Sequence, residues 1–357
     1  MSTPRQPGID LLKVLASQLI VLHHLSAYGP VAEAMHRLAP APLGWLYGYA
    51  RMAVQVFLVL GGYLAVQRLA PAMAGHAGAL ARTVWRRYLR LAPPFLVALL
   101  LALVAAAWAR PWLGGDVVPE APTWRQWLAH AALLHETLDV DALSAGVWYV
   151  AIDFQLYALL ALLLWLGQRG GQSVRAMALV IGATALSLGW WNRYPGLDDG
   201  PLYFLGAYGL GVAARWAGEQ SDRWQRIGWL GAMLLVGALA LVLEFRTRIA
   251  LALAVAFWLA LTQGRYPALP SGPAQRVLGI LSRSSYALFL VHFPVLLLGN
   301  ALFERAGLHG GTATIAAFAL MGATSVALGW AFERWVEAPL AQGIGSAGRR
   351  RAPPLAG

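Results

Sequence analysis

Side chains capable of acid–base chemistry lie along one face of the first apolar segment. With about 100° of rotation per residue, one stripe is formed by Asp10, Lys13, Ser17 and His24. His23 points about 100° away from His24. Ionisable groups at membrane depth are costly and usually functional, so we interpret His24 as a candidate general base. A hydrogen bond from His24 to a neighbouring helix is the structural alternative, and Asp10 with Lys13 reads as a structural pair three residues apart.

A carboxylate at comparable depth follows in the fourth apolar segment. Tyr149, Asp153 and Tyr157 are spaced by four residues and share a helix face. If Asp153 reaches His24, it fixes the tautomer of the imidazole and stabilises the imidazolium, as a general-base histidine requires. The alternative is that an arginine from another helix neutralises Asp153. The residues alone do not decide whether Asp153 contacts His24 or an arginine.

Two arginines stand at the inner mouth of the third apolar segment. Arg87 and Arg90 are three residues apart, so they project from one side of a helix and could bind phosphates through paired hydrogen bonds. Topology alone also accounts for arginines at this position.

In the ninth apolar segment, Ser285 and His292 share a helix face beside Pro294, which should kink the helix. This arrangement suits a substrate tunnel, but His292 could equally be a packing histidine.

The composition indicates the elements that must position these residues. The chain is 59% hydrophobic and 12% charged, whereas a soluble globular chain is about 25% charged. Apolar stretches of about 17 to 25 residues, long enough to cross a bilayer, occur about ten times. The sequence therefore predicts an all-α, multi-pass membrane domain over residues 1–340, with a disordered tail over residues 341–357. The first apolar run lacks a signal-peptide cleavage site and is expected to be a retained span.

Basic residues set the predicted orientation of this bundle. With the N-terminus in the cytoplasm, 18 arginines fall on the inner side and 8 on the outer side, as the positive-inside rule requires. Both termini are then cytoplasmic, and the scattered basic residues do not indicate nucleic-acid binding. The absence of cysteine excludes disulfides and thiolate catalysis, and no metal is expected.

In the longest outer loop, residues 123–136 fit either a short interfacial helix or a loop resting on the headgroups.

Taken together, these segments resemble acyltransferase family 3, whose members acylate carbohydrates and other exported acceptors. The segments that carry the resemblance, in the family's order, are residues 8–24, 57–64, 87–90, 148–157, 285–294 and 332–339. Three positions depart from the family's usual residues: Lys13 replaces Arg, Gly61 replaces Ser, and Asp153 replaces Glu. We expect the membrane-only form of the family, without an appended esterase-like domain.

The resemblance implies an O-acyltransferase of the bacterial inner membrane. Cytoplasmic acyl-CoA, most simply acetyl-CoA, would be held by Arg87 and Arg90. His24, oriented by Asp153, would remove the proton of an acceptor hydroxyl outside the cytoplasm, on a carbohydrate, glycan or other exported molecule. Residues expected to support the site are Asp10, Lys13, Tyr157, Ser285 and His292.

Three alternatives remain open from the sequence. The acyl group could be succinyl or another acyl group rather than acetyl, and transfer could pass through an acyl-histidine. The rival function is a proton-coupled transporter that uses Asp10, His24, Asp153 and His292. No internal repeat of the kind common in transporters is found.

Overall fold

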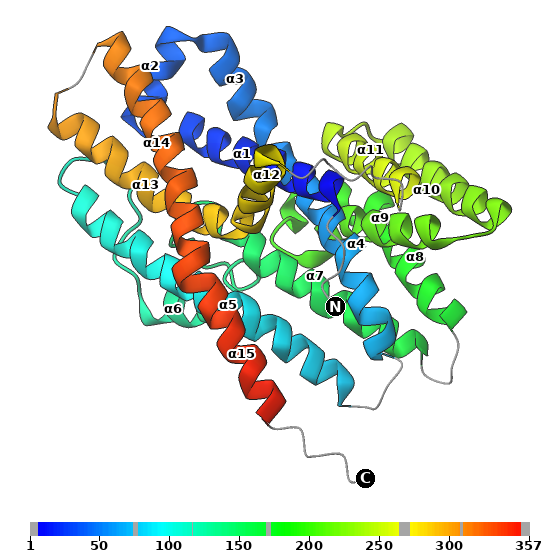
Figure 1. Cartoon of the computed structure of the whole chain (residues 1–357). Coiled ribbons are helices and arrows are strands. Elements are labelled where there is room, and N and C mark those ends of the chain that lie inside the picture. The colour runs from blue at the N-terminus through cyan, green and yellow to red at the C-terminus, as the bar shows by residue number, and fades with distance from the viewer. Residues whose placement is uncertain are drawn as a thin grey trace.

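The computed structural model describes residues 6–73, 78–115, 117–168, 173–263, 272–307 and 310–350. These residues form helices and no strands (Figure 1), which confirms the all-α prediction. The long helices are α1 (Pro7–Ala27), α4 (Val54–Met73), α5 (Ala79–Ala109), α7 (Trp148–Gln168), α8 (Ser173–Gly189), α9 (Pro201–Glu219), α10 (Arg223–Leu243), α11 (Thr247–Thr262), α13 (Ser285–Arg305) and α14 (Gly311–Phe332). The shorter ones are α2 (Pro30–Leu38), α3 (Pro40–Tyr49), α6 (Trp124–Ala131), α12 (Pro273–Arg283), α15 (Ala338–Arg350), the 3-10 turns η1 (Ala50–Ala53), η2 (Trp191–Arg193) and η3 (Pro195–Leu197), and the π-helical turn η4 (Glu333–Glu337).

Each of the ten predicted spans corresponds to one of the long helices. Within the described residues, eight helices are long and apolar enough to cross a membrane. The two that fall short are α9 and α11. Helix α11 has only 16 residues, whereas α9 is largely buried among α4, α8 and α11. The multi-pass membrane class is thus confirmed, while length and composition support eight spans rather than ten.

Glycines allow the central helices to approach closely. Helix α9 packs along α4. A Cβ atom on Gly62 would lie 1.9 Å from the carbonyl oxygen of Tyr208, and one on Gly211 would lie 1.9 Å from that of Val59. Only glycine fits at these contacts, as is usual where helices associate in a bilayer. This contact fixes α4, which carries one wall of the cavity described below, against the α8–α11 group.

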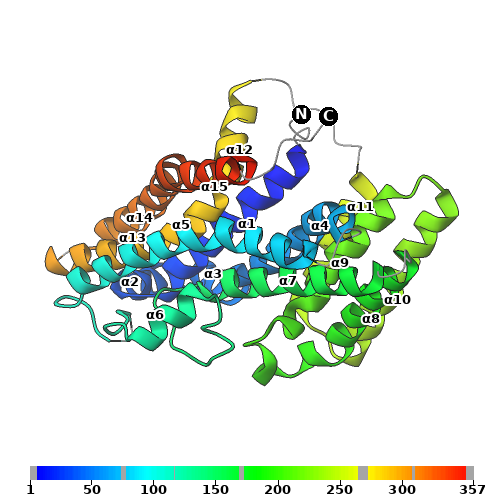
Figure 2. The ribbon, with the colours of Figure 1, turned by 90° about the horizontal axis from the view of Figure 1, so that it is seen from below.

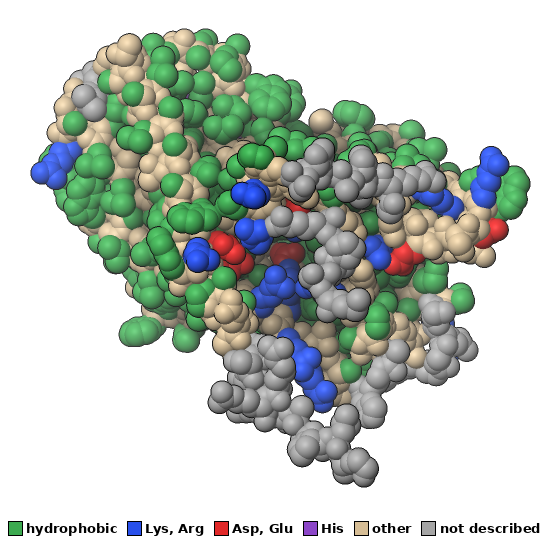
Figure 3. Space-filling model, in the orientation of Figure 1, with side chains coloured by type: hydrophobic (Ala, Val, Ile, Leu, Met, Phe, Trp, Pro, Cys, Tyr) green, Lys and Arg blue, Asp and Glu red, His purple; other side chains and the backbone are tan. Residues whose placement is uncertain are grey.

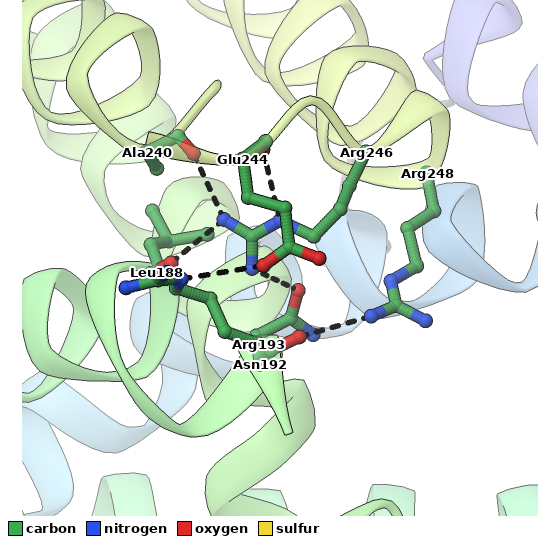
Figure 4. A network of polar contacts seen from close by, with 7 residues as sticks. All are labelled: Leu188, Asn192, Arg193, Ala240, Glu244, Arg246 and Arg248. Carbon is green, nitrogen blue, oxygen red and sulfur yellow. Dashed lines mark hydrogen bonds and ion pairs between the residues drawn. The ribbon is translucent and has the colours of Figure 1, made fainter. Parts of the chain in front are cut away.

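A buried arginine ties together the ends of three helices in that group (Figure 4). The guanidinium of Arg246 donates to the carbonyl oxygens of Leu188 (2.9 Å) and Ala240 (3.0 Å) and to the side-chain oxygen of Asn192 (2.8 Å). The last carbonyls of a helix have no partner within the helix. Arg246, just before α11, therefore satisfies such groups at the ends of α8 and α10. Its role is structural.

Of the two alternatives left open for residues 123–136, the structure has a short helix, α6. Its first turn is closed by a capping box, in which Gln126 N donates to Thr123 Oγ1 and Thr123 N donates to the Gln126 side chain. Trp124 and Leu128 are exposed on its outer face. In Figure 2, α6 lies at one edge of the molecule, and α12 and α15 lie at the opposite edge.

The tail expected to be disordered from residue 341 is helical up to Arg350, which corrects that prediction. Helix α14 passes through η4 into α15 without a break. Pro339 lies inside this continuous helix, two residues after the π-helical turn, and does not end it. Residues 351–357 lie outside the described residues.

Candidate active site

A cavity of about 500 Å³ opens between α1, α5, α7, α12 and η4. Figure 3 shows charged side chains gathered around a hollow in the middle of this face. The charged residues that line the cavity are Asp10, Lys13, Arg87, Arg90, Asp153, Arg283, Glu333 and Glu337. It runs from residues near the start of α1 and at the end of α12 to Tyr149 in the first turn of α7. It therefore passes deep into the bundle.

Within this cavity, Asp153 binds an arginine rather than a histidine. The guanidinium of Arg87, on α5, forms an ion pair with the Asp153 carboxylate on α7. The same guanidinium lies 5.0 Å from the centre of the Tyr157 ring. Of the two partners left open by the sequence, the structure has the arginine, so the expected contact between Asp153 and His24 is corrected. A buried carboxylate needs a cationic partner, and the long side chain of Arg87 supplies it.

The partner of His24 is His292, on α13. The Nδ1 atom of His24 lies 2.7 Å from Nε2 of His292, and the rings stack with centres 4.7 Å apart. On its other side, Nδ1 of His292 lies 2.7 Å from the carbonyl oxygen of Phe289 and 3.3 Å from that of Leu288. Both histidines are buried. Sequence reasoning named both histidines but did not pair them.

These contacts assign the tautomers of both rings. A carbonyl oxygen can only accept, so Nδ1 of His292 carries a proton and its Nε2 is an acceptor when the ring is neutral. The Nδ1 atom of His24 must then be the donor to His292. This leaves Nε2 of His24 with a free lone pair, which is the state that a general base requires. No hydrogen bond to this Nε2 is found among the described residues.

The residues expected to support the site are divided between these two regions. Asp10 and Lys13 line the cavity. No salt bridge joins them, and the Asp10 carboxylate accepts a hydrogen bond from the Ser282 hydroxyl at 2.5 Å. Ser285 also lines the cavity, and its hydroxyl donates to the Ser282 carbonyl at 2.9 Å. Tyr157 stacks on Arg87 as described. The two histidines are not among the residues that line the cavity.

Three charged cavity residues were not assigned to a site from the sequence. Arg283 supported only the predicted membrane orientation. Glu333 and Glu337 lie in the segment 332–339, which contributed to the family resemblance but to no predicted site. The π-helical turn places both glutamates on the cavity wall. Such turns are frequent at functional sites, but nothing in the sequence marks where the helix widens. One side-chain oxygen of Glu337 is buried without a hydrogen-bond partner.

Comparison with known families adds to this geometry. The model of an acyltransferase domain matches residues 6–334, a range that includes the histidine pair and nearly all of the cavity lining. Comparisons with curated proteins and with solved structures give no match. The family match covers nearly the whole chain, and its helices are long and apolar enough to cross a membrane several times. The chain therefore belongs to acyltransferase family 3 and is a multi-pass membrane acyltransferase.

Proposed function

We propose that this acyltransferase moves an acyl group from cytoplasmic acyl-CoA to a hydroxyl group on the other side of the bacterial inner membrane. The observation that carries the proposal is the hydrogen-bonded chain from the Phe289 carbonyl through His292 to His24. This chain holds His24 in the tautomer with a free Nε2. A proton-coupled transporter could also use such a histidine, but the family match favours acyl transfer.

The proposed reaction uses His24 as the catalytic base. Its Nε2 takes the proton of the acceptor hydroxyl while the oxygen attacks the thioester carbonyl carbon. The carbon–sulfur bond then breaks, and the departing CoA thiolate takes the proton from the His24 imidazolium. His292 keeps its own proton throughout and stabilises the imidazolium by accepting a hydrogen bond from Nδ1. Attack by the same Nε2 on the thioester, giving an acyl-histidine, is the alternative order.

The cavity is the proposed entrance for the donor. Its volume of about 500 Å³ lies within the usual range of about 300 to 1,000 Å³ for small-molecule sites. Arg87 is paired with Asp153. Within the described part of the chain, the cations on the wall without a salt bridge to a carboxylate are Lys13, Arg90 and Arg283. We therefore assign phosphate binding mainly to Arg90, with Arg87 anchoring the wall of the cavity.

The acceptor and the acyl group follow from the family resemblance. We propose acetyl as the acyl group and a carbohydrate or glycan as the acceptor. The arginine distribution of 18 inner against 8 outer residues supports cytoplasmic termini. In that orientation, the cavity-lining residues near the start of α1 and at the end of α12 would lie on the cytoplasmic side. The acceptor then approaches His24 from the opposite side.

Purified protein in detergent, with radiolabelled acetyl-CoA and a panel of sugars, tests this proposal. The wild type should release CoA in an acceptor-dependent manner, and His24→Ala should abolish that release. His23→Ala is the matched control, because His23 points away and contacts the Leu46 carbonyl at 3.3 Å. It should retain most of the activity. Equal loss in both variants, or loss in neither, would show that His24 is not the base.

A further inference from the structure

The deep end of the cavity is lined by three aromatic rings. Tyr149, on α7, and Phe289, on α13, both line the cavity. Their ring centres are 5.5 Å apart, and the planes meet at 70°. Phe57, on α4, also lines the cavity and lies against Tyr149, with ring centres 6.1 Å apart. The cavity thus ends in an aromatic wall whose members come from three helices.

The histidine pair lies on the other side of this wall. The Phe289 ring centre is 6.0 Å from that of His292. A Cβ atom placed on Gly146 would lie 3.0 Å from Cε1 of His24 and 3.4 Å from Cζ of Phe289. The Cε1 atom of His24 and the Phe289 ring therefore flank the same glycine. Cε1 is bonded to Nε2, so the Phe289 ring stands between the cavity and the proposed base.

We propose that the Phe289 side chain limits the length of the acyl group that this enzyme transfers. The inference rests on the proposed function, because the thioester must meet the free Nε2 of His24 beyond the aromatic wall. Phe289 is 8% exposed and is held between Tyr149 and His292. A short acyl group needs little space beside this ring, whereas each further methylene must displace packed atoms.

The side chain of Phe289 can be changed without removing the contact that positions the histidines. The hydrogen bond from His292 Nδ1 goes to the backbone carbonyl of Phe289, which every substitution retains. Phe289→Ala removes the ring and joins the cavity to the space beside His24. Phe289→Leu removes less volume and keeps an apolar side chain in the packing. The two variants should therefore relax the length limit to different extents.

The experiment compares acetyl-, butyryl- and hexanoyl-CoA as donors for purified protein, with the sugar panel used above. The measured quantity is the ratio of kcat/KM for hexanoyl-CoA to that for acetyl-CoA. In Phe289→Ala this ratio should rise by about tenfold or more, since a misfit of one methylene can alter selection by 10- to 200-fold. Phe289→Leu should give a smaller rise. If the alanine variant does not fold, the leucine variant carries the test.

Phe293→Ala is the matched control. Phe293 lies one turn further along α13, is buried, and packs against Tyr28 rather than lining the cavity. Its ratio should equal that of the wild type. An unchanged ratio in the Phe289 variants, or an equal rise in Phe293→Ala, overturns the inference while the proposed function stands. A wild type that transfers no acyl group from any of the three donors overturns the proposed function itself.

Discussion

A histidine that acts as a base needs one ring nitrogen fixed by a hydrogen bond and the other free to accept a proton. In this protein the fixing hydrogen bond is made to a second histidine. His292 accepts from Nδ1 of His24 at 2.7 Å and donates to the Phe289 carbonyl at 2.7 Å. In serine hydrolases a carboxylate has this task. A neutral imidazole bound to a backbone carbonyl does the same without placing another charge in the buried site.

Removing His292 should therefore lower turnover more than donor binding. We expect His292→Ala to reduce kcat by about 100-fold or more, by analogy with the loss of a tautomer-fixing group, and to leave the KM for acyl-CoA nearly unchanged. His292→Gln, whose side-chain oxygen can accept from Nδ1, should restore part of kcat. A purely structural role predicts instead that both variants lose protein yield and that neither separates kcat from KM.

Asp153 and Arg87 act as a pair, and their substitutions should not be additive. Asp153→Asn leaves a buried guanidinium without its carboxylate, and Arg87→Gln leaves a buried carboxylate without its cation, at a cost of about 3 to 5 kcal/mol each. The double variant removes both charges and should unfold at a temperature above that expected from adding the single losses. Thermal unfolding in detergent measures this. Strict additivity would contradict the pairing.

The sequence predicted His24 and Asp153 as site residues but not the partners that they contact. His24 and Asp153 were placed at similar depths because helical rise converts sequence position into depth. Depth does not specify which way each helix faces its neighbours. A long arginine from α5 reaches Asp153 first, and a histidine on α13 reaches His24. The polar stripe on α1 could be predicted because all of its residues lie on one helix.

At the scale of elements, the segment after α6 is held by two stacked histidines. The rings of His130 and His135 are parallel, with centres 4.0 Å apart, and both lie against Phe95 of α5. His130 Nδ1 donates to the Gln126 carbonyl, and its Nε2 accepts from Leu143 N. Burial lowers the pKa of His130 and lowers the pKa of His135 to about 3. Both rings are therefore neutral in the folded protein near neutral pH.

This pair should make the segment after α6 sensitive to acid. When the segment opens, the pKa of His135 returns toward 6.5, so the open state binds more protons than the closed state between about pH 6.5 and 3. Stability is thus complete above that window and is lost as the pH falls through it. Hydrogen exchange of residues 132–147, corrected for intrinsic rates, should show more frequent opening at about pH 5 than at about pH 7. His135→Phe should reduce this dependence, and an unchanged dependence would contradict it.

The helices themselves were largely predictable, because long apolar runs in a membrane protein have few other structures available. The helices α9 and α11 were also predicted, although their length or composition does not mark them as spans. The π-helical turn before α15 could not be predicted. It arises where α14 meets the cavity wall, and the residues Glu333–Glu337 carry no local signal for a widened turn.

At the scale of the whole molecule, the two halves of the proposed reaction have separate compartments. The charged cavity opens at one end of the bundle and stops at the aromatic wall, and His24 lies beyond it. In the proposed reaction, the donor and the acceptor would therefore reach His24 from opposite sides of the Phe289 ring. This arrangement suits transfer across a membrane, in which donor and acceptor never mix.

Sealed, right-side-out membrane vesicles measure that transfer directly. Radiolabelled acetyl-CoA is enclosed in vesicles containing the wild type, and the sugar panel is added outside. We expect labelled sugar in the outer solution with the wild type and with His23→Ala, and none with His24→Ala at equal protein content. Labelling that proceeds without His24, or that requires acetyl-CoA and sugar on the same side, would contradict it.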